Sequence, residues 1–177
     1  MYSMLTTSLY PLDQCHSTTL SVVLWYGVLV GLPASLVRRL QSVLNASARL
    51  ICYLRRSDHI TDTLINLHWL RVPGRIQDKI AVQTHKVLHG TASRYLGPRS
   101  RVADLPGRRY FRSASSDRLA VPPYKLSTIG CRIFKVASAQ TWNGLPENVT
   151  SSPTISSFRL QLKTHLLHLS YPDLVLQ

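Results

Sequence analysis

Between residues 33 and 90 the apolar side chains recur every three or four positions, which is the spacing of one face of an α-helix. Proline suits the first turn of such a helix, and glycine after the last apolar residue suits its end. The apolar spacing and the positions of proline and glycine predict helices near 33–54, 60–68 and 73–90. The positions expected to face inward in the first of these helices are Leu36, Leu40, Val43, Leu44, Ile51 and Leu54.

The next two helices follow the same rules. Asp58 or Thr61 is expected to cap the helix near 60–68, and Gly90 is expected to end the helix near 73–90. The inward positions of these two helices are Ile60, Leu64 and Leu67, followed by Ile76, Ile80, Gln83 or Thr84, Val87 and Leu88.

The segment NLHWLRVPGRIQ, residues 66–77, lies where these two helices meet. It is typical of a helix end, a turn and a helix that begins at Pro73. Trp69 is expected to be a buried anchor between the helices, and an exposed platform for base stacking is the alternative. Burial is favoured because it removes more apolar area from water. Arg71 and Arg75 flank the turn and are candidates for contacts to a nucleic-acid backbone.

Residues 97–127 have no helical period and contain Gly, Pro and Ser throughout. Arginines and aromatic residues are interleaved along this stretch: Arg99, Arg101, Arg108, Arg109, Tyr110, Phe111, Arg112, Arg118 and Tyr124. Single-stranded nucleic acid would suit this pattern, because bases stack on rings and arginines hold phosphates. A charged surface loop with short strands at 108–113 and 118–121 remains an equal alternative.

Helical spacing returns after residue 127. A short helix is expected to turn Ile133, Phe134, Ala137 and Trp142 inward and to end at Gly144 and Pro146. Ser152 is then expected to cap a last helix that has Pro153 in its first turn. The apolar stripe of this last helix consists of Ile155, Phe158, Leu162, Leu166 and Leu169.

These patterns predict a mainly α protein, a small helical bundle with a basic irregular or short-strand insertion near 97–127. The expected organisation is an apolar leader, a helical segment, the basic aromatic loop, C-terminal helices and a tail, at 1–32, 33–96, 97–127, 128–170 and 171–177.

The stretch 19–37 contains no charged residue and is followed directly by Arg38 and Arg39. A buried strand or short core helix is the favoured interpretation, because Gly27, Gly31 and other breakers interrupt the run. A membrane anchor is the minority alternative.

The net charge is +13, from 21 Lys and Arg against 8 Asp and Glu. Such an excess attracts nucleic acid or an anionic membrane, although a solvated basic surface without a specific partner is the alternative. Three well-separated cysteines, Cys15, Cys52 and Cys131, favour a reducing compartment, which would be nuclear or cytoplasmic.

No arrangement typical of catalysis is found in the sequence. It has no glycine-rich phosphate loop, no GxSxG or HExxH, and no adjacent pair of carboxylates. His85 with His89 and His165 with His168 have helical spacing without a third metal ligand, so surface histidines are expected. We expect no enzyme activity, no cofactor, no metal and no small-molecule substrate.

Several sequence segments occur in a fixed order over about residues 26–170. Together they resemble the region downstream of the polymerase palm in reverse transcriptases of non-LTR retrotransposons (LINE-type, jockey and CR1-like). These segments are GLPASLVRRLQSVLNASARLI, RRSDHITDTLINLHWLRVPGRIQDKIAVQTHKVLHG, ASRYLGP, GRRYFRSASSDRLAVPPYKLSTIGCRIF and TWNGLPENV…SFRLQLKTHL. The resemblance implies a mainly helical thumb and C-terminal fragment that grips template RNA and target DNA. It implies no catalytic aspartate, because the palm is absent.

The expected function is sequence-tolerant binding of RNA or DNA. The expected phosphate contacts are Arg38, Arg39, Arg55, Arg56, Arg108, Arg109 and Arg112, and the expected stacking residues are Tyr110 and Phe111. The alternatives are a membrane-tethered or protein-interaction module and a degenerate remnant with no selected function. Departures from the family pattern at residues 1–20, Asp78, Gln83 and Cys131 favour the remnant.

Overall fold

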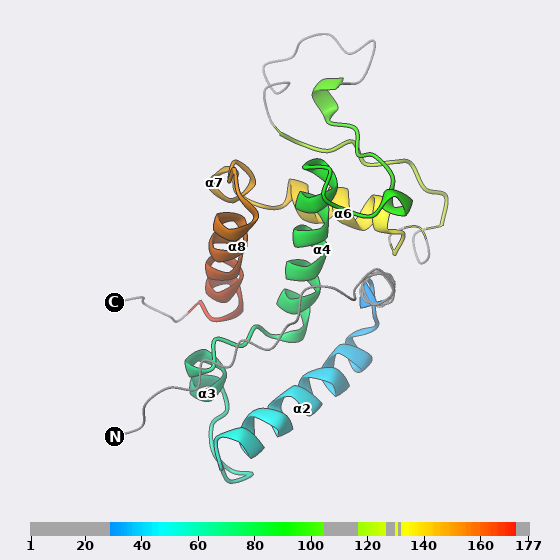
Figure 1. The fold of residues 1–177 in the computed structure, drawn as a ribbon. Helices are drawn as coiled ribbons and strands as arrows, with labels where there is room; N and C mark the ends of the chain where they lie inside the picture. The colour runs from blue at the N-terminus through cyan, green and yellow to red at the C-terminus, as the bar shows by residue number, and fades with distance from the viewer. Residues whose placement is uncertain (1–28, 105–116, 127–129, 131, 173–177) are drawn as a thin grey trace.

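The computed structural model describes residues 29–104, 117–126, 130 and 132–172, and the chain is mainly α-helical, as expected (Figure 1). Its α-helices are α2 (Ala34–Ile51), α3 (Thr61–Asn66), α4 (Val72–Leu88), α6 (Phe134–Asn143), α7 (Glu147–Thr150) and α8 (Ile155–Ser170). Two 3-10 turns, η1 (Arg94–Leu96) and η2 (Val102–Asp104), follow α4. The leader at 1–28 and the tail at 173–177 lie outside the described residues.

Helix α4 is central and contacts α2, α6 and α8 (Figure 1). The main core lies between α4, α6 and α8, and it includes Trp142 at 3% exposure and Phe158 at 0% exposure. The Phe158 ring lies 5.7 Å from the Trp142 ring and 4.4 Å from the His85 ring, measured between centroids. Aromatic contacts therefore join one residue of each of the three helices at the centre of the core.

Helix α2 packs against α4 through a different stripe from the one expected. Val37, Leu44 and Ala48 contact the core, and the side chain of Gln41 accepts a 2.9 Å hydrogen bond from the Val72 N–H. Most of the expected inward positions are exposed instead: Leu36, Leu40, Val43 and Ile51. The apolar face of α2 is wider than the part that α4 and α3 cover, so one half remains in solvent.

The turn between α3 and α4 has the helix–turn–helix form expected. His68 adopts a left-handed backbone, with φ of 52°, and Pro73 lies in the first turn of α4. Trp69 is half-buried and packs against Leu64 and its neighbours. The expected cap of α3 is wrong, because Asp58 accepts a 2.8 Å hydrogen bond from the Arg55 N–H and closes the preceding turn.

The insertion after η1 is irregular in the part that the structure describes. The short strand expected at 118–121 is wrong: Leu119 forms only an isolated bridge with Arg101. The side-chain amide of Asn143 replaces a strand partner, since it accepts from the Leu119 N–H at 2.8 Å and donates to the Leu119 carbonyl at 3.0 Å. Leu119 is thereby buried on α6 without a sheet.

Three details near the C-terminus differ from expectation. The cap of α8 is Thr154, whereas the Ser152 hydroxyl is buried and donates to Gln161 at 2.6 Å. Ile133 is exposed because it precedes the first turn of α6 and lies outside its packed face. Leu169, the last member of the expected stripe, is 65% exposed, whereas Leu166 and Tyr171 on either side of it are buried.

We expect Phe158→Ala to lower the free energy of unfolding by about 3–5 kcal/mol, because it leaves a cavity between three helices. Leu169→Ala, in the same helix and the same sequence stripe, should change it by no more than about 0.5 kcal/mol. Urea unfolding followed by circular dichroism measures both values. Similar losses in the two variants would contradict this position of the core.

Candidate nucleic-acid interface

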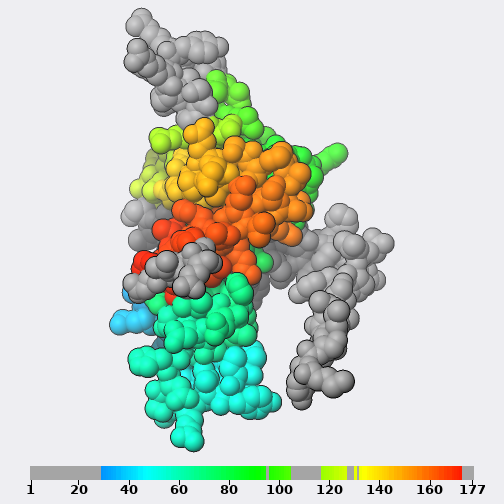
Figure 2. Space-filling model, turned by 90° about the vertical axis from the view of Figure 1, so that its left-hand side faces the viewer, coloured from blue at the N-terminus to red at the C-terminus, as the bar shows by residue number. Residues whose placement is uncertain are grey.

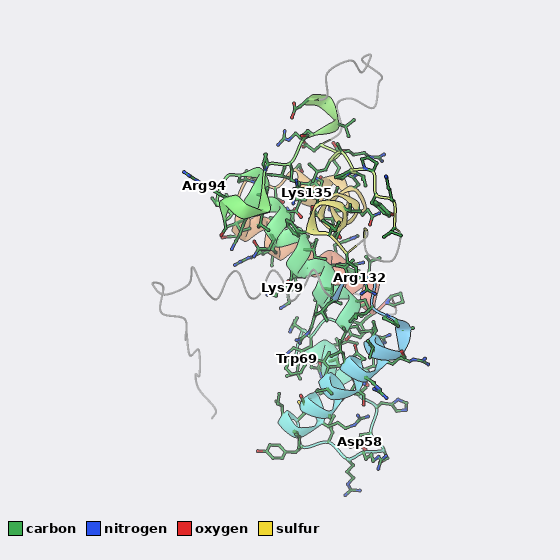
Figure 3. All side chains as sticks on the ribbon, turned by 90° about the vertical axis from the view of Figure 1, so that its right-hand side faces the viewer. Asp58, Trp69, Lys79, Arg94, Arg132 and Lys135 are labelled. Carbon is green, nitrogen blue, oxygen red and sulfur yellow. The ribbon has the colours of Figure 1, made fainter. Side chains whose placement is uncertain are left out.

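Four cations lie along one side of α4, at positions that are exposed or half-buried among the residues that the structure describes. They are Arg71 at its N-cap, followed by Arg75, Lys79 and Lys86 at spacings of four, four and seven residues. These spacings place all four on one helical face, here named the α4 basic face, which extends about 22 Å at 1.5 Å per residue. Figure 3 shows Lys79 on the same side of the molecule as Arg94 and Trp69.

Two of these arginines rest on aromatic rings. The Arg71 guanidinium carbon lies 5.1 Å from the centre of the Tyr171 ring, and that of Arg75 lies 5.0 Å from the centre of the Trp69 ring. Arg75 also donates to the Leu70 carbonyl at 3.1 Å, and the Tyr171 hydroxyl donates to the Trp69 carbonyl at 2.9 Å. Cation–π contacts hold the guanidinium groups in place without neutralising their charge.

A second group of cations lies where α4 meets α8. Burial raises the pKa of the Asp78 carboxyl, and the positive charges of Lys79, Arg159 and Lys163 oppose that rise without cancelling it. The two α8 cations are therefore near the edge of the α4 basic face.

The positive charge is left largely unpaired. In the part of the chain that the structure describes, the one ion pair joins Arg101 to Asp117 at 3.2 Å, and both side chains are about half exposed. An exposed pair of this kind contributes little to stability. The chain has 21 basic and 8 acidic residues, and ion pairs within the described residues neutralise little of its positive charge.

The helical arginines expected at a nucleic-acid site do not form one cluster. Arg38 and Arg39 are exposed near the start of α2, and Arg55 and Arg56 are exposed beyond its end. Arg39 lies 12 residues before the end of α2 at Ile51, which is about 18 Å along the helix axis, and Arg55 and Arg56 come after that end. The loop residues expected there, Arg108, Arg109, Tyr110, Phe111 and Arg112, lie outside the described part of the chain.

Arg99 in the basic loop has an internal role. Its Nε donates to the Ser138 hydroxyl at 3.1 Å, and its guanidinium carbon lies 4.9 Å from the centre of the Phe134 ring. Burial lowers the pKa of Arg99 from its usual value. Arg99 is held on α6 and Arg101 is paired with Asp117, so these two arginines of the loop make contacts within the protein.

Sequence reasoning identified Arg71 and Arg75 but missed the rest of the α4 basic face. The signal was present, because Lys79 continues the same four-residue spacing. From the sequence alone, this spacing could not be distinguished from that of an ordinary solvent-exposed helix face, because the buried sides of α4 were not known.

The expectation of surface histidines is wrong for His85. Its side chain is 2% exposed, and its ring stacks on that of His89 at 3.9 Å between centroids. His89 uses Nδ1 for a 2.9 Å hydrogen bond with the His85 carbonyl, which fits a helix end better than a metal ligand. Across the described ranges no group of three or more His, Cys, Asp or Glu side chains is placed to bind a metal ion.

No protein-family model, curated protein or solved structure matches this chain. Among the described residues, no helix has both the length and the hydropathy needed to cross a membrane. Residues 19–28, which form most of the anchor considered from sequence, are outside that range.

We expect the free energy of unfolding to fall as the pH is lowered through about 6.5. Burial, and then the neighbouring charge of His89, lower the pKa of His85 below its ordinary 6.5, against a raising effect of the Ser152 carbonyl. The unfolded chain therefore binds a proton that the folded chain does not, so stability is retained above pH 6.5 and lost below it.

Urea unfolding at about pH 7.5 and about pH 5.5 measures this change. His85→Leu should reduce the difference in stability between the two pH values, whereas His59→Gln, a change at an exposed histidine, should leave it intact. The assignment is wrong if His85→Leu retains the full pH dependence.

Proposed function

We propose that this chain is a non-catalytic protein that binds RNA or DNA with little sequence preference, and that it corresponds to the thumb and C-terminal fragment of a LINE-type reverse transcriptase. The observation that carries the proposal is the unpaired positive charge, above all on the α4 basic face. Lys and Arg held near phosphates release condensed counterions, which provides affinity without reading the bases.

Two further observations support this proposal. The mainly helical fold agrees with the region that the sequence resembles. Arg71 and Arg75 are already ordered on aromatic rings, so binding a phosphate would cost them less side-chain entropy than it costs a free arginine. The proposal assigns the protein no cofactor and no metal, because the resembled region does not include the catalytic aspartates.

Replacing cations on this surface should reduce the salt dependence of binding. Each lost phosphate contact lowers the slope of log affinity against log salt by about 0.7 for a single strand. We expect Lys79→Gln with Lys86→Gln to lower it by about 1.4, and Arg108→Gln with Arg109→Gln and Arg112→Gln by about 2.1. Fluorescence anisotropy of the full chain with labelled single-stranded RNA, single-stranded DNA and duplex DNA across a salt series measures these slopes.

Arg132→Gln with Lys135→Gln provides the control that matches the α4 double variant in charge, since both residues are exposed and neither belongs to the α4 basic face or to residues 97–127. This control should leave the slope almost unchanged. Equal losses in all three variants would mean that net charge alone attracts nucleic acid and that no particular surface holds it. An unchanged slope in the triple variant would remove the loop arginines from the interface.

A protein-interaction module is the second candidate, and the exposed half of α2 favours it. This apolar stripe, defined as Leu36, Leu40, Val43, Leu50 and Ile51, extends along most of the helix, and Val43 is 66% exposed. Contiguous apolar surface of this kind usually packs against another protein surface. A fragment separated from a larger protein would expose such a face.

We expect Val43→Ser with Leu50→Ser to reduce self-association and hydrophobic-dye binding without loss of helical circular dichroism. Light scattering and dye fluorescence measure the effect. The comparison variant is Val37→Ser with Leu44→Ser, which removes contacts of the buried half and should unfold α2 from α4. Unchanged scattering and dye binding in the first variant would exclude the stripe as a contact surface.

A further inference from the structure

A groove lies between the end of α3 and the outer side of α8, on the face shown in Figure 2, where α8 lies directly above α3. Its volume is about 370 Å³, which falls in the range of ordinary ligand and side-chain pockets. The lining residues are Ile65, His68, Leu160, Lys163, Thr164, Leu167 and His168. Neither of the two candidate functions above uses this groove.

The floor of the groove is aliphatic and lacks a covering element among the described residues. Leu160 is 70% exposed, although it lies in the middle of α8. Ile65 and Leu167 are half-buried, because their other sides pack on the hydrophobic cluster around Leu64 and Tyr171. A second helix that supplied a leucine or isoleucine would cover these three residues together.

The rim of the groove is cationic or neutral. Lys163 lines it directly, Arg159 lies one turn earlier on α8, and no carboxylate is among the lining residues, although that of Asp78 on α4 lies near these two cations. His68 and His168 stand at its edges and can donate hydrogen bonds. An occupant that complements this rim carries carboxylates beside its apolar side chains.

His68 is placed at the groove by an unusual backbone conformation. Its φ of 52° is left-handed, a region that residues other than glycine seldom adopt. The His68 N–H donates to the Ile65 carbonyl at 2.8 Å, and the next N–H, of Trp69, donates to the Leu64 carbonyl at 2.8 Å. This turn fixes the backbone of His68 at the end of the aliphatic floor, and its exposed imidazole lines the groove there.

We propose that this groove binds an acidic amphipathic helix of a partner protein, which inserts an apolar side chain between Ile65, Leu160 and Leu167 and places carboxylates near Lys163 and the two histidines. A protein helix fits better than a nucleobase. The three aliphatic side chains, Ile65, Leu160 and Leu167, outnumber the two aromatic rings of the lining, the imidazoles of His68 and His168, whereas single-stranded bases bind chiefly by stacking on aromatic rings. This inference does not depend on the proposed nucleic-acid binding.

The probe is a fluorescein-labelled synthetic helix of about 16 residues, with leucines at i, i+3, i+4 and i+7 and glutamates elsewhere on its surface. A scrambled peptide of identical composition, whose leucines share no face, controls for attraction to the net charge of +13. Anisotropy titrations with the full chain should show tighter binding of the patterned peptide.

Three variants locate the binding site. Leu160→Ala should weaken binding of the patterned peptide about tenfold, and Leu169→Ala, at a similarly exposed leucine of the same helix outside the groove, should not. Lys163→Gln should weaken the patterned peptide more than the scrambled one. His68→Gly retains a residue suited to the left-handed turn while removing the imidazole, and it too should weaken binding.

Two results would overturn the proposal. One is equal affinity for the patterned and scrambled peptides, or equal losses from Leu160→Ala and Leu169→Ala. The other is loss of RNA affinity in Leu160→Ala together with displacement of the peptide by single-stranded RNA. That second result would make the groove part of the nucleic-acid surface, whereas unchanged RNA affinity in Leu160→Ala supports a separate protein site.

Discussion

The burial of α4 on three of its sides is the constraint on which the rest of the structure depends. Ile76 and Ile80 pack toward α2 and α6, while Ala81, Val82 and His85 pack toward α6 and α8. A helix enclosed in this way leaves few positions for charged residues, because burying an unpaired cation is costly. Arg75, Lys79 and Lys86 occupy exposed or half-buried positions that their spacing places on one face of α4.

The same constraint explains how so basic a chain can fold. Like charges destabilise a compact state, and internal ion pairs offset little of that repulsion in the described residues. Arg71, Arg75 and Arg99 instead use aromatic rings and backbone or hydroxyl acceptors. The contacts of Arg71 and Arg75 leave their positive charge at the surface and available to a polyanion, which is why nucleic-acid binding is the function we favour.

The surface also has two apolar regions that differ in character. The α2 stripe is long and lies beside arginines, whereas the groove between α3 and α8 is short, concave and rimmed by Lys163 and histidines. Long helical stripes fit another helix along their length, and a concave groove fits one inserted side chain with its flanking polar groups. A chain with such surfaces is better suited to act within an assembly than alone.

The sequence by itself determined the mainly helical class, the positions of the helices and the turn at residues 66–77, since apolar spacing, Pro73 and Gly90 act through the local backbone. The tertiary structure alone decided which half of α2 is buried, that His85 is internal, and that Asn143 holds Leu119 without a strand. The apolar periodicity of α2 gives the width of its apolar face but does not say which element packs against that face. Burial of either half of the face was therefore equally consistent with the sequence. The burial of His85 and the alignment of the α4 basic face required the positions of α6 and α8, which no local pattern contains.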